Sequence, residues 1–195
     1  MKFGKSICRF SFMLLIAVLF SIGNADAQKV AVKTNLLYAA TTSPNAAIEM
    51  RMSDKTTLEL GGGMSLWKFG EKSTLKHWLV QPEVRYWFCD VFNGHFVGLH
   101  AHGGQYNIGG LDIPVGRLSE LKDHRYQGYF YGAGVSYGYQ WILGRHWNME
   151  ASLGAGYARV MYEKFPCAHC GTKQSEGAYN YWGLTRGTLS LIYVF

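Results

Sequence analysis

Charged side chains recur in this sequence at alternating positions within apolar or glycine-rich segments. Four acids and four bases share the pattern: Lys33, Glu49, Arg51, Glu59, Glu83, Arg85, Glu150 and Arg186. If these segments are β-strands, the eight side chains point to one face of a sheet. They then either line a narrow polar pore or neutralise one another in a salt-bridge network. Because an unpaired buried charge is costly, the equal number of acids and bases favours the network.

Two histidines, His100 and His102, have the i, i+2 spacing of two metal ligands on one strand. Zinc takes at least three protein ligands, and the sequence identifies no third one nearby. We therefore expect these histidines to form hydrogen bonds inside the fold. Ser119 and His124 share an expected loop, but closeness in sequence does not make a nucleophile and its base. We expect no catalytic residue, no cofactor and no metal site.

A second pair of reactive groups is Cys167 and Cys170, with His169 between them. Such thiols either bind a metal or form a disulfide. An exported chain meets an oxidising compartment, and this favours a disulfide that braces the loop.

The first 27 residues have the features of a secretory signal peptide. A basic start with Lys2, Lys5 and Arg9 precedes an apolar run over 10–22, which is short for a membrane-spanning helix. Small residues end at Ala27, so we expect cleavage before Gln28. The sequence thus predicts a signal peptide at 1–27, export through the secretory pathway and one domain at 28–195.

The composition is unusual for a water-soluble domain. Charged residues make up 16% and aromatic residues 15% of the chain, which leaves few charges to cover a soluble surface. No apolar run after residue 27 is long enough for a spanning helix, and closed barrels are the other structure that satisfies its backbone in lipid. The formal net charge of +6 is scattered rather than gathered in a stripe, so we expect no nucleic-acid partner.

Period-two alternation of apolar and polar residues predicts eight strands. We place them at 30–38, 45–52, 56–67, 77–89, 95–106, 126–141, 147–162 and 179–195. The connections 53–55, 90–94 and 142–146 are short, whereas 68–76, 107–125 and 163–178 are long, and only 39–44 departs from this rule. Such alternation is typical of an all-β, eight-stranded antiparallel transmembrane β-barrel with short periplasmic turns and longer outer loops. Aromatic residues, among them Phe88, Phe92, Phe96, Trp141, Trp147, Tyr193 and Phe195, are expected to form a girdle at the periplasmic rim.

Several stretches resemble an outer-membrane barrel family of Bacteroidales that is classed as a domain of unknown function. They are VKTNLLY at 32–38 with TTSPN at 41–45, HWLVQPE at 77–83 with RYWF at 85–88, NGHFVG at 93–98 and GYQW at 138–141. The resemblance covers nearly all of the chain after residue 27. It implies an outer-membrane β-barrel that accompanies fimbria-type surface proteins, and it implies no activity. The terminal Phe195 resembles the signal that the barrel-assembly machinery recognises.

We therefore expect a non-enzymatic outer-membrane barrel in contact with lipid, with a structural or surface-interaction role in fimbrial or envelope assembly. Its outer loops 107–125 and 163–178 would contact the partner. Two alternatives stay open at this point: a narrow channel for small solutes and a lipid-modifying barrel enzyme.

Overall fold

The computed structural model describes residues 30–69, 73–109, 125–166 and 174–195. In chain order the elements are β1 (Val30–Asn35), α2 (Leu36–Ala40), β2 (Asn45–Arg51), β3 (Thr56–Phe69), β4 (Ser73–Trp87), β5 (Gly94–Gly109), β6 (Arg125–Ile142), β7 (Trp147–Phe165) and β8 (Ser175–Val194). Among these residues, no helix reaches the length and hydropathy that crossing a membrane requires.

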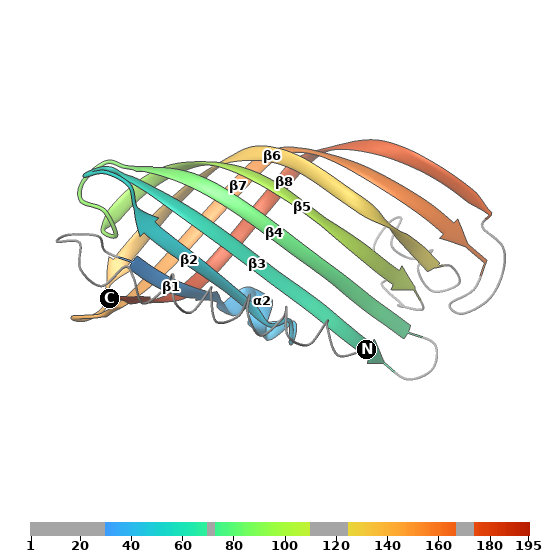
Figure 1. Cartoon of the computed structure of the whole chain (residues 1–195), viewed down its shortest axis with the longest axis horizontal. Coiled ribbons are helices and arrows are strands. Elements are labelled where there is room, and N and C mark those ends of the chain that lie inside the picture. Colours follow the sequence, from blue (N-terminus) through green and yellow to red (C-terminus); the bar gives the residue numbers. More distant parts are fainter. Residues whose placement is uncertain (1–29, 70–72, 110–124, 167–173) are drawn as a thin grey trace, which may run out of the picture.

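Each strand pairs antiparallel with the next one, and β1 pairs with β8. The eight strands therefore form one sheet that closes on itself (Figure 1). This confirms the predicted all-β fold of eight antiparallel strands. The connections 52–55, 88–93 and 143–146 lie at the same end as the start of β1 and the end of β8. We call this end the turn end and the opposite end the loop end.

Alternation along the strands separates two faces of the closed sheet. Large apolar side chains are exposed on the outer face, where Leu99 is 64%, Val135 62% and Leu153 65% exposed. On the inner face, Glu83, Arg85 and other ionisable side chains are buried. The period of two fixes this arrangement, because a shift of one residue would exchange the two faces of a strand.

The first predicted strand is wrong in its second half. β1 ends at Asn35, and Leu36–Ala40 form the short helix α2 instead of continuing to Tyr38. The cause is local: the Asn35 side chain accepts a hydrogen bond from Leu37 N at 3.1 Å and so caps the helix. The Asn45 side chain also bonds the main chain of Asn35, accepting from its N at 2.6 Å and donating to its O at 3.0 Å.

The predicted long connection at 68–76 is also wrong. β3 continues to Phe69 and β4 starts at Ser73, so only residues 70–72 lie between them. The strands on either side of the other two long connections also run further than predicted, and these connections shorten to 110–124 and 166–174. Strand pairing satisfies backbone groups that a loop would leave to water, and this favours the longer strands.

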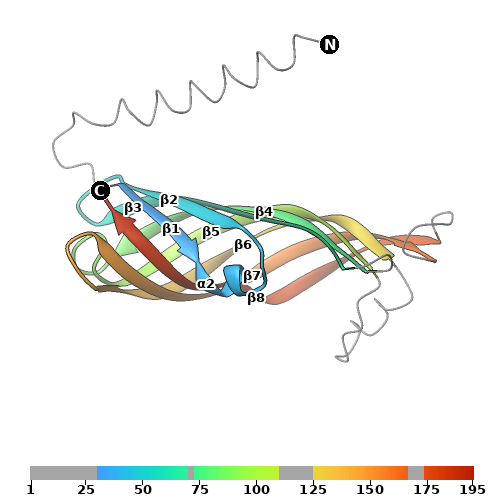
Figure 2. The same ribbon diagram turned by 90° about the horizontal axis from the view of Figure 1, so that it is seen from below.

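The strands differ greatly in length. β1 and β2 have 6 and 7 residues, whereas β3 to β8 have 14 to 20. Figures 1 and 2 show β1 and β2 confined to the half of the sheet near the turn end, while the other strands continue to the loop end. The turn-end half is thus enclosed by eight strands, and the loop-end half is open on the side where β1 and β2 stop.

Candidate functional site

Seven buried ionisable side chains meet inside the closed sheet, and we call them the ionic layer. They are Lys33, Glu49, Glu59, Glu83, Arg85, Glu150 and Arg186, and none is more than 9% exposed. They come from β1, β2, β3, β4, β7 and β8, so segments far apart in the sequence supply them. The structure therefore brings together seven of the eight residues from which the sequence predicts a charge network.

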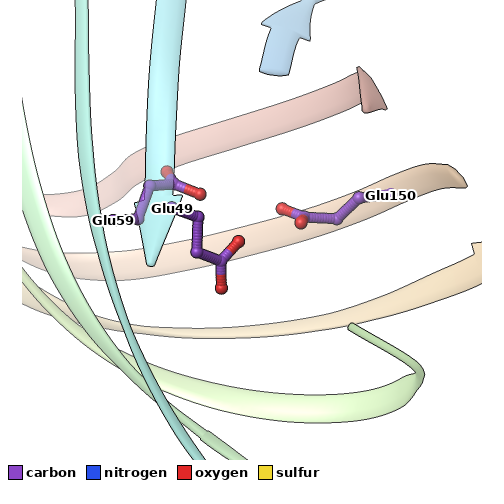
Figure 3. A group of neighbouring side chains, drawn as sticks. All are labelled: Glu49, Glu59 and Glu150. Atoms are coloured by element: carbon purple, nitrogen blue, oxygen red, sulfur yellow. The ribbon is translucent and has the colours of Figure 1, made fainter. Parts of the chain in front are cut away.

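Lys33 lies at the centre of three carboxylates. Its Nζ is 3.1 Å from Glu59 Oε2 and 2.6 Å from Glu150 Oε2, and it also contacts Glu49. Oxygens of these three glutamates lie within 4.8 Å of one another, and Figure 3 shows the side chains entering the interior from different strands. Hard divalent cations favour such oxygen sets. Here the Lys33 ammonium is the cation among the carboxylates.

Arg85 and Arg186 complete the ionic layer. Arg85 Nη2 is 2.7 Å from Glu59 Oε2, and Arg85 Nη1 is 2.8 Å from Glu150 Oε2 and 3.2 Å from Glu49 Oε2. Arg186 forks between two acids, with Nη2 2.5 Å from Glu59 Oε1 and Nη1 2.9 Å from Glu83 Oε2. Guanidinium groups suit such shared contacts because their donors are held in a fixed plane. The arrangement neutralises charge and orders the interior.

Arg51 does not join the ionic layer. Its guanidinium pairs with Asp54 in the connection between β2 and β3, and its side chain is 27% exposed. The alternation predicts its face correctly, but Arg51 is the last residue of β2 and reaches solvent at the turn end. The ionic layer therefore contains four carboxylates and three cations, not the equal numbers that the sequence suggests.

A buried apolar group lies next to the ionic layer at the turn end, and we call it the apolar plug. Its members are Ala31, Trp87, Phe92, Phe96 and Ile192. The Trp87 ring centroid is 4.9 Å from that of Phe96 and 6.1 Å from that of Phe92. The Arg85 guanidinium carbon lies 4.4 Å from the Phe96 ring centroid, which joins the plug to the ionic layer.

The predicted places of Phe92 and Phe96 in the aromatic girdle are wrong, because both rings are buried in the apolar plug. A signal was present in the sequence: Phe96 and Trp87 alternate with outward-facing residues and share the face of Gly98 and Arg85. Phe92 lies in the turn with a φ of 65°. This conformation is unfavourable for a bulky residue, and burial of its ring offsets the cost.

The two histidines lie on the loop-end side of the ionic layer. His100 Nε2 is 2.9 Å from Thr185 Oγ1, and the rings of His100 and His102 are 5.7 Å apart. Thr185 is the extra residue of a β-bulge in β8, opposite the step from Gly154 to Ala155. A bulge re-aims a side chain, and this one brings Thr185 to His100. The sequence identified no carboxylate near the pair, whereas the register places Glu83 directly opposite His100.

Glycines on the inner face make room for these large side chains. A methyl group on Gly98 would lie 2.5 Å from Ser136 Oγ and would overlap the Glu83 carboxylate. A methyl group on Gly154 would lie 3.0 Å from both Arg186 Cβ and His100 Cε1. The glycine content of the strands thus follows from the size of the groups that share the interior.

The helix α2 is held against the sheet by Tyr38. The Tyr38 hydroxyl is 2.7 Å from His77 Nε2, and the two rings meet edge to face at 5.7 Å. Gly63 makes this approach feasible, because a Cβ there would lie 2.8 Å from Tyr38 Cε1.

The loop end contains a different kind of space. A cavity of about 710 Å³ crosses the ends of β5 to β8 and is lined by Tyr106, Gln127 and Glu163 among others. Tyr106 donates a hydrogen bond to Met161 O at 3.0 Å, and Gln127 Nε2 donates to Glu163 Oε2 at 3.0 Å. The polar residues at the loop end thus surround open space, whereas those of the ionic layer fill the interior.

Residues 10–195 match the model of a family described as "Protein of unknown function (DUF3575)". The chain belongs to this family. No curated protein matches it. Membership in the DUF3575 family agrees with the expected domain of unknown function, and its description names no activity.

Some residues that the sequence analysis weighed in this DUF3575 chain lie outside the described residues. They are the Cys167–Cys170 pair, the cleavage position between Ala27 and Gln28, and Ser119 with His124. The disulfide and the signal peptide stay predictions. Of the thiols in the described part of the chain, Cys89 is free and exposed.

Proposed function

We propose that this DUF3575 chain is an exported outer-membrane β-barrel with a non-enzymatic role, and that it binds a surface partner in fimbrial or envelope assembly. The observation that carries the proposal is the distribution of side chains over a closed sheet. Its outer face exposes Leu99, Val135 and Leu153, and its inner face holds the ionic layer. A water-soluble barrel needs the reverse arrangement, because large exposed apolar surfaces are unfavourable in water.

Strand length supports the same proposal. A tilted transmembrane strand needs roughly 9 to 11 residues, and β3 to β8 have 14 to 20. These strands therefore extend past a bilayer at the loop end. The resemblance to barrels that accompany fimbria-type proteins points to the partner class. In this proposal the loop end faces outward, so it is the end that binds the partner.

The interior weighs against a channel. The ionic layer and the apolar plug contain Arg85, Trp87 and Phe96, each with no exposed surface. At the level of the ionic layer and the apolar plug, side chains fill the narrow interior that eight strands enclose. The purified barrel should give no current in a planar bilayer.

A lysine substitution tests whether lipid covers the outer face. Leu153→Lys should destabilise the chain refolded in bilayers by about 2 to 4 kcal/mol, since a cation near mid-bilayer costs this much. Met52→Lys is the matched control: it is 64% exposed but lies at the turn end, so its cost should stay below about 1 kcal/mol. If both variants unfold at the same urea concentration as the parent, the outer face does not contact lipid. Heat-modifiable gel mobility and outer-membrane fractionation of the parent chain provide the second measurement.

A further inference from the structure

β8 has an unpaired side over its loop-end half. β1 pairs with β8 only between Ser190 and Val194, after which the chain leaves the sheet as α2. On its other side β8 pairs with β7 throughout this half. Within residues 30–69, 73–109, 125–166 and 174–195, no strand pairs with Gly177–Leu184 on the side away from β7. We call Gly177–Leu184 the β8 edge.

Side chains stand in for a strand where β1 leaves β8. Asn35 Nδ2 donates to Gly187 O at 3.2 Å, and Leu189 N donates to Asn35 Oδ1 at 3.3 Å. Further along, the Tyr181 hydroxyl donates to Leu184 O at 3.3 Å. These contacts show that backbone groups of β8 face the unpaired side and are satisfied there by single side chains.

The β8 edge contains none of the residue types that usually protect a strand against pairing. Natural edge strands are blocked by lysine, proline or inward charges, and the sequence GAYNYWGL at 177–184 has none of these. Its aromatic side chains are also exposed: Trp182 is 76% and Tyr179 50% exposed. Exposed aromatic residues are the usual anchors of protein interfaces.

β1 and β2 both stop before they reach the level of the β8 edge. Near the turn end, β1 and β2 lie between β8 and β3. β2 pairs with β3 only as far as Gly63, and β3 continues to Phe69 without it. At the loop end neither β1 nor β2 therefore lies between β8 and β3 (Figure 1).

We propose that the β8 edge binds an extended segment of a partner protein, which pairs antiparallel with Gly177–Leu184 and continues the line of β1. This inference rests on the proposed surface-binding role and names the chemistry of the partner. An extended polypeptide satisfies an exposed strand edge through regularly spaced main-chain hydrogen bonds, whereas an acyl chain has no donors or acceptors to offer. Apolar and polar side chains alternate along the partner segment, and its apolar side chains lie beside Trp182 and Leu184.

A register experiment in the membrane of the source cells tests the proposal. A photoreactive amino acid replaces Ala178, Asn180 or Trp182 in the full chain, and the residue it cross-links is identified by mass spectrometry. For each step of two residues toward the C-terminus of β8, the cross-linked residue of the partner should move two residues toward its own N-terminus. The same group at Ala151, on the outer face of β7, should give lipid adducts only.

A second measurement removes one tryptophan from the chain that carries the photoreactive amino acid at position 180. Trp182→Ala should lower the yield of the protein cross-link at position 180 at least tenfold, because an interface anchor is lost. Trp147→Ala removes an exposed tryptophan at the turn end and should leave the yield unchanged.

Three outcomes overturn the inference: lipid adducts alone at all three positions, a partner residue that does not move with the probe, or a stepping register within a second copy of this chain. Fractionation and heat-modifiable mobility are measured on the same samples. If the parent chain is absent from the outer membrane, the proposed function fails. If it is present but gives no stepping register, only the partner segment is refuted.

Discussion

The two halves of the closed sheet differ in what their polar residues do. In the turn-end half, eight strands enclose the ionic layer and the apolar plug, and the charged groups are buried against one another. In the loop-end half, β1 and β2 are missing, a cavity of about 710 Å³ is present and the β8 edge is unpaired. The difference suggests that the turn-end half provides stability while the loop-end half is available for binding.

The contrast has a simple physical basis. Buried charges are favourable only when cations and carboxylates meet in good geometry, and this needs strands on all sides. The loop-end half, which β1 and β2 do not reach, cannot keep a cluster of charged side chains away from water. Substitutions in the turn-end half should therefore change the free energy of unfolding strongly, and those in the loop-end half should change it little.

The largest effect is expected for Arg85→Leu. Arg85 contacts four glutamates of the ionic layer, and its loss leaves buried carboxylates without a counter-charge. Removing one partner of a buried ion pair costs about 3 to 5 kcal/mol. Urea unfolding of the refolded barrel measures this loss in the free energy of unfolding. Arg51→Leu is the control, because the exposed pair with Asp54 contributes at most about 1 kcal/mol. Equal losses in the two variants would refute the special role of the ionic layer.

The apolar plug should give the next largest effect. Phe96→Ala removes a fully buried ring that contacts Trp87 and Arg85, and such truncations cost about 3 kcal/mol or more. Phe88→Ala removes a ring of the same size from the outer face, where it is 47% exposed. The same urea titration should show a clearly smaller loss for this second variant. A larger loss at Phe88 would mean that outer contacts, not the plug, stabilise the turn end.

The sequence predicts the number of strands and their faces better than it predicts which side chains meet in the interior. Period-two alternation is a local signal, so it identifies eight strands and the face on which Glu49 or Glu150 lies. It does not show where a strand ends, because the Asn35 cap and the extra pairing of β3 with β4 depend on neighbours. It also does not show which residues of one face meet: Arg51 shares the face of Glu49, yet only its position at the end of β2 explains why it lies apart. The place of Thr185 beside His100 depends on a bulge that the sequence does not reveal.

A glycine substitution sharpens the comparison between the inner and outer faces of one strand. A methyl group on Gly98 would overlap Glu83 and approach Ser136 Oγ, so Gly98→Ala should cost about 1 to 3 kcal/mol through overpacking. Gly103, on the outer face of the same strand, has its nearest neighbour, Phe130 O, at 3.6 Å. Gly103→Ala should therefore change the free energy of unfolding by less than about 0.5 kcal/mol. If the two variants have the same urea midpoint, the interior at Gly98 is not packed as described.

The smallest effect on stability is expected at the boundary between the two halves. Asn35 caps α2 through Leu37 N and satisfies backbone groups of β8 at Gly187 and Leu189. Asn35→Ala should lower the free energy of unfolding by only about 1 kcal/mol, the usual cost of a lost helix cap. Hydrogen exchange should respond more strongly than this, because the amides of Leu37 and Leu189 lose their partner while the amides of β3 to β7 keep theirs. A uniform rise in exchange over all strands would mean that the halves unfold as one unit. A rise confined to α2 and β8 would show that the loop-end half opens separately, as a binding surface beside a stable base requires.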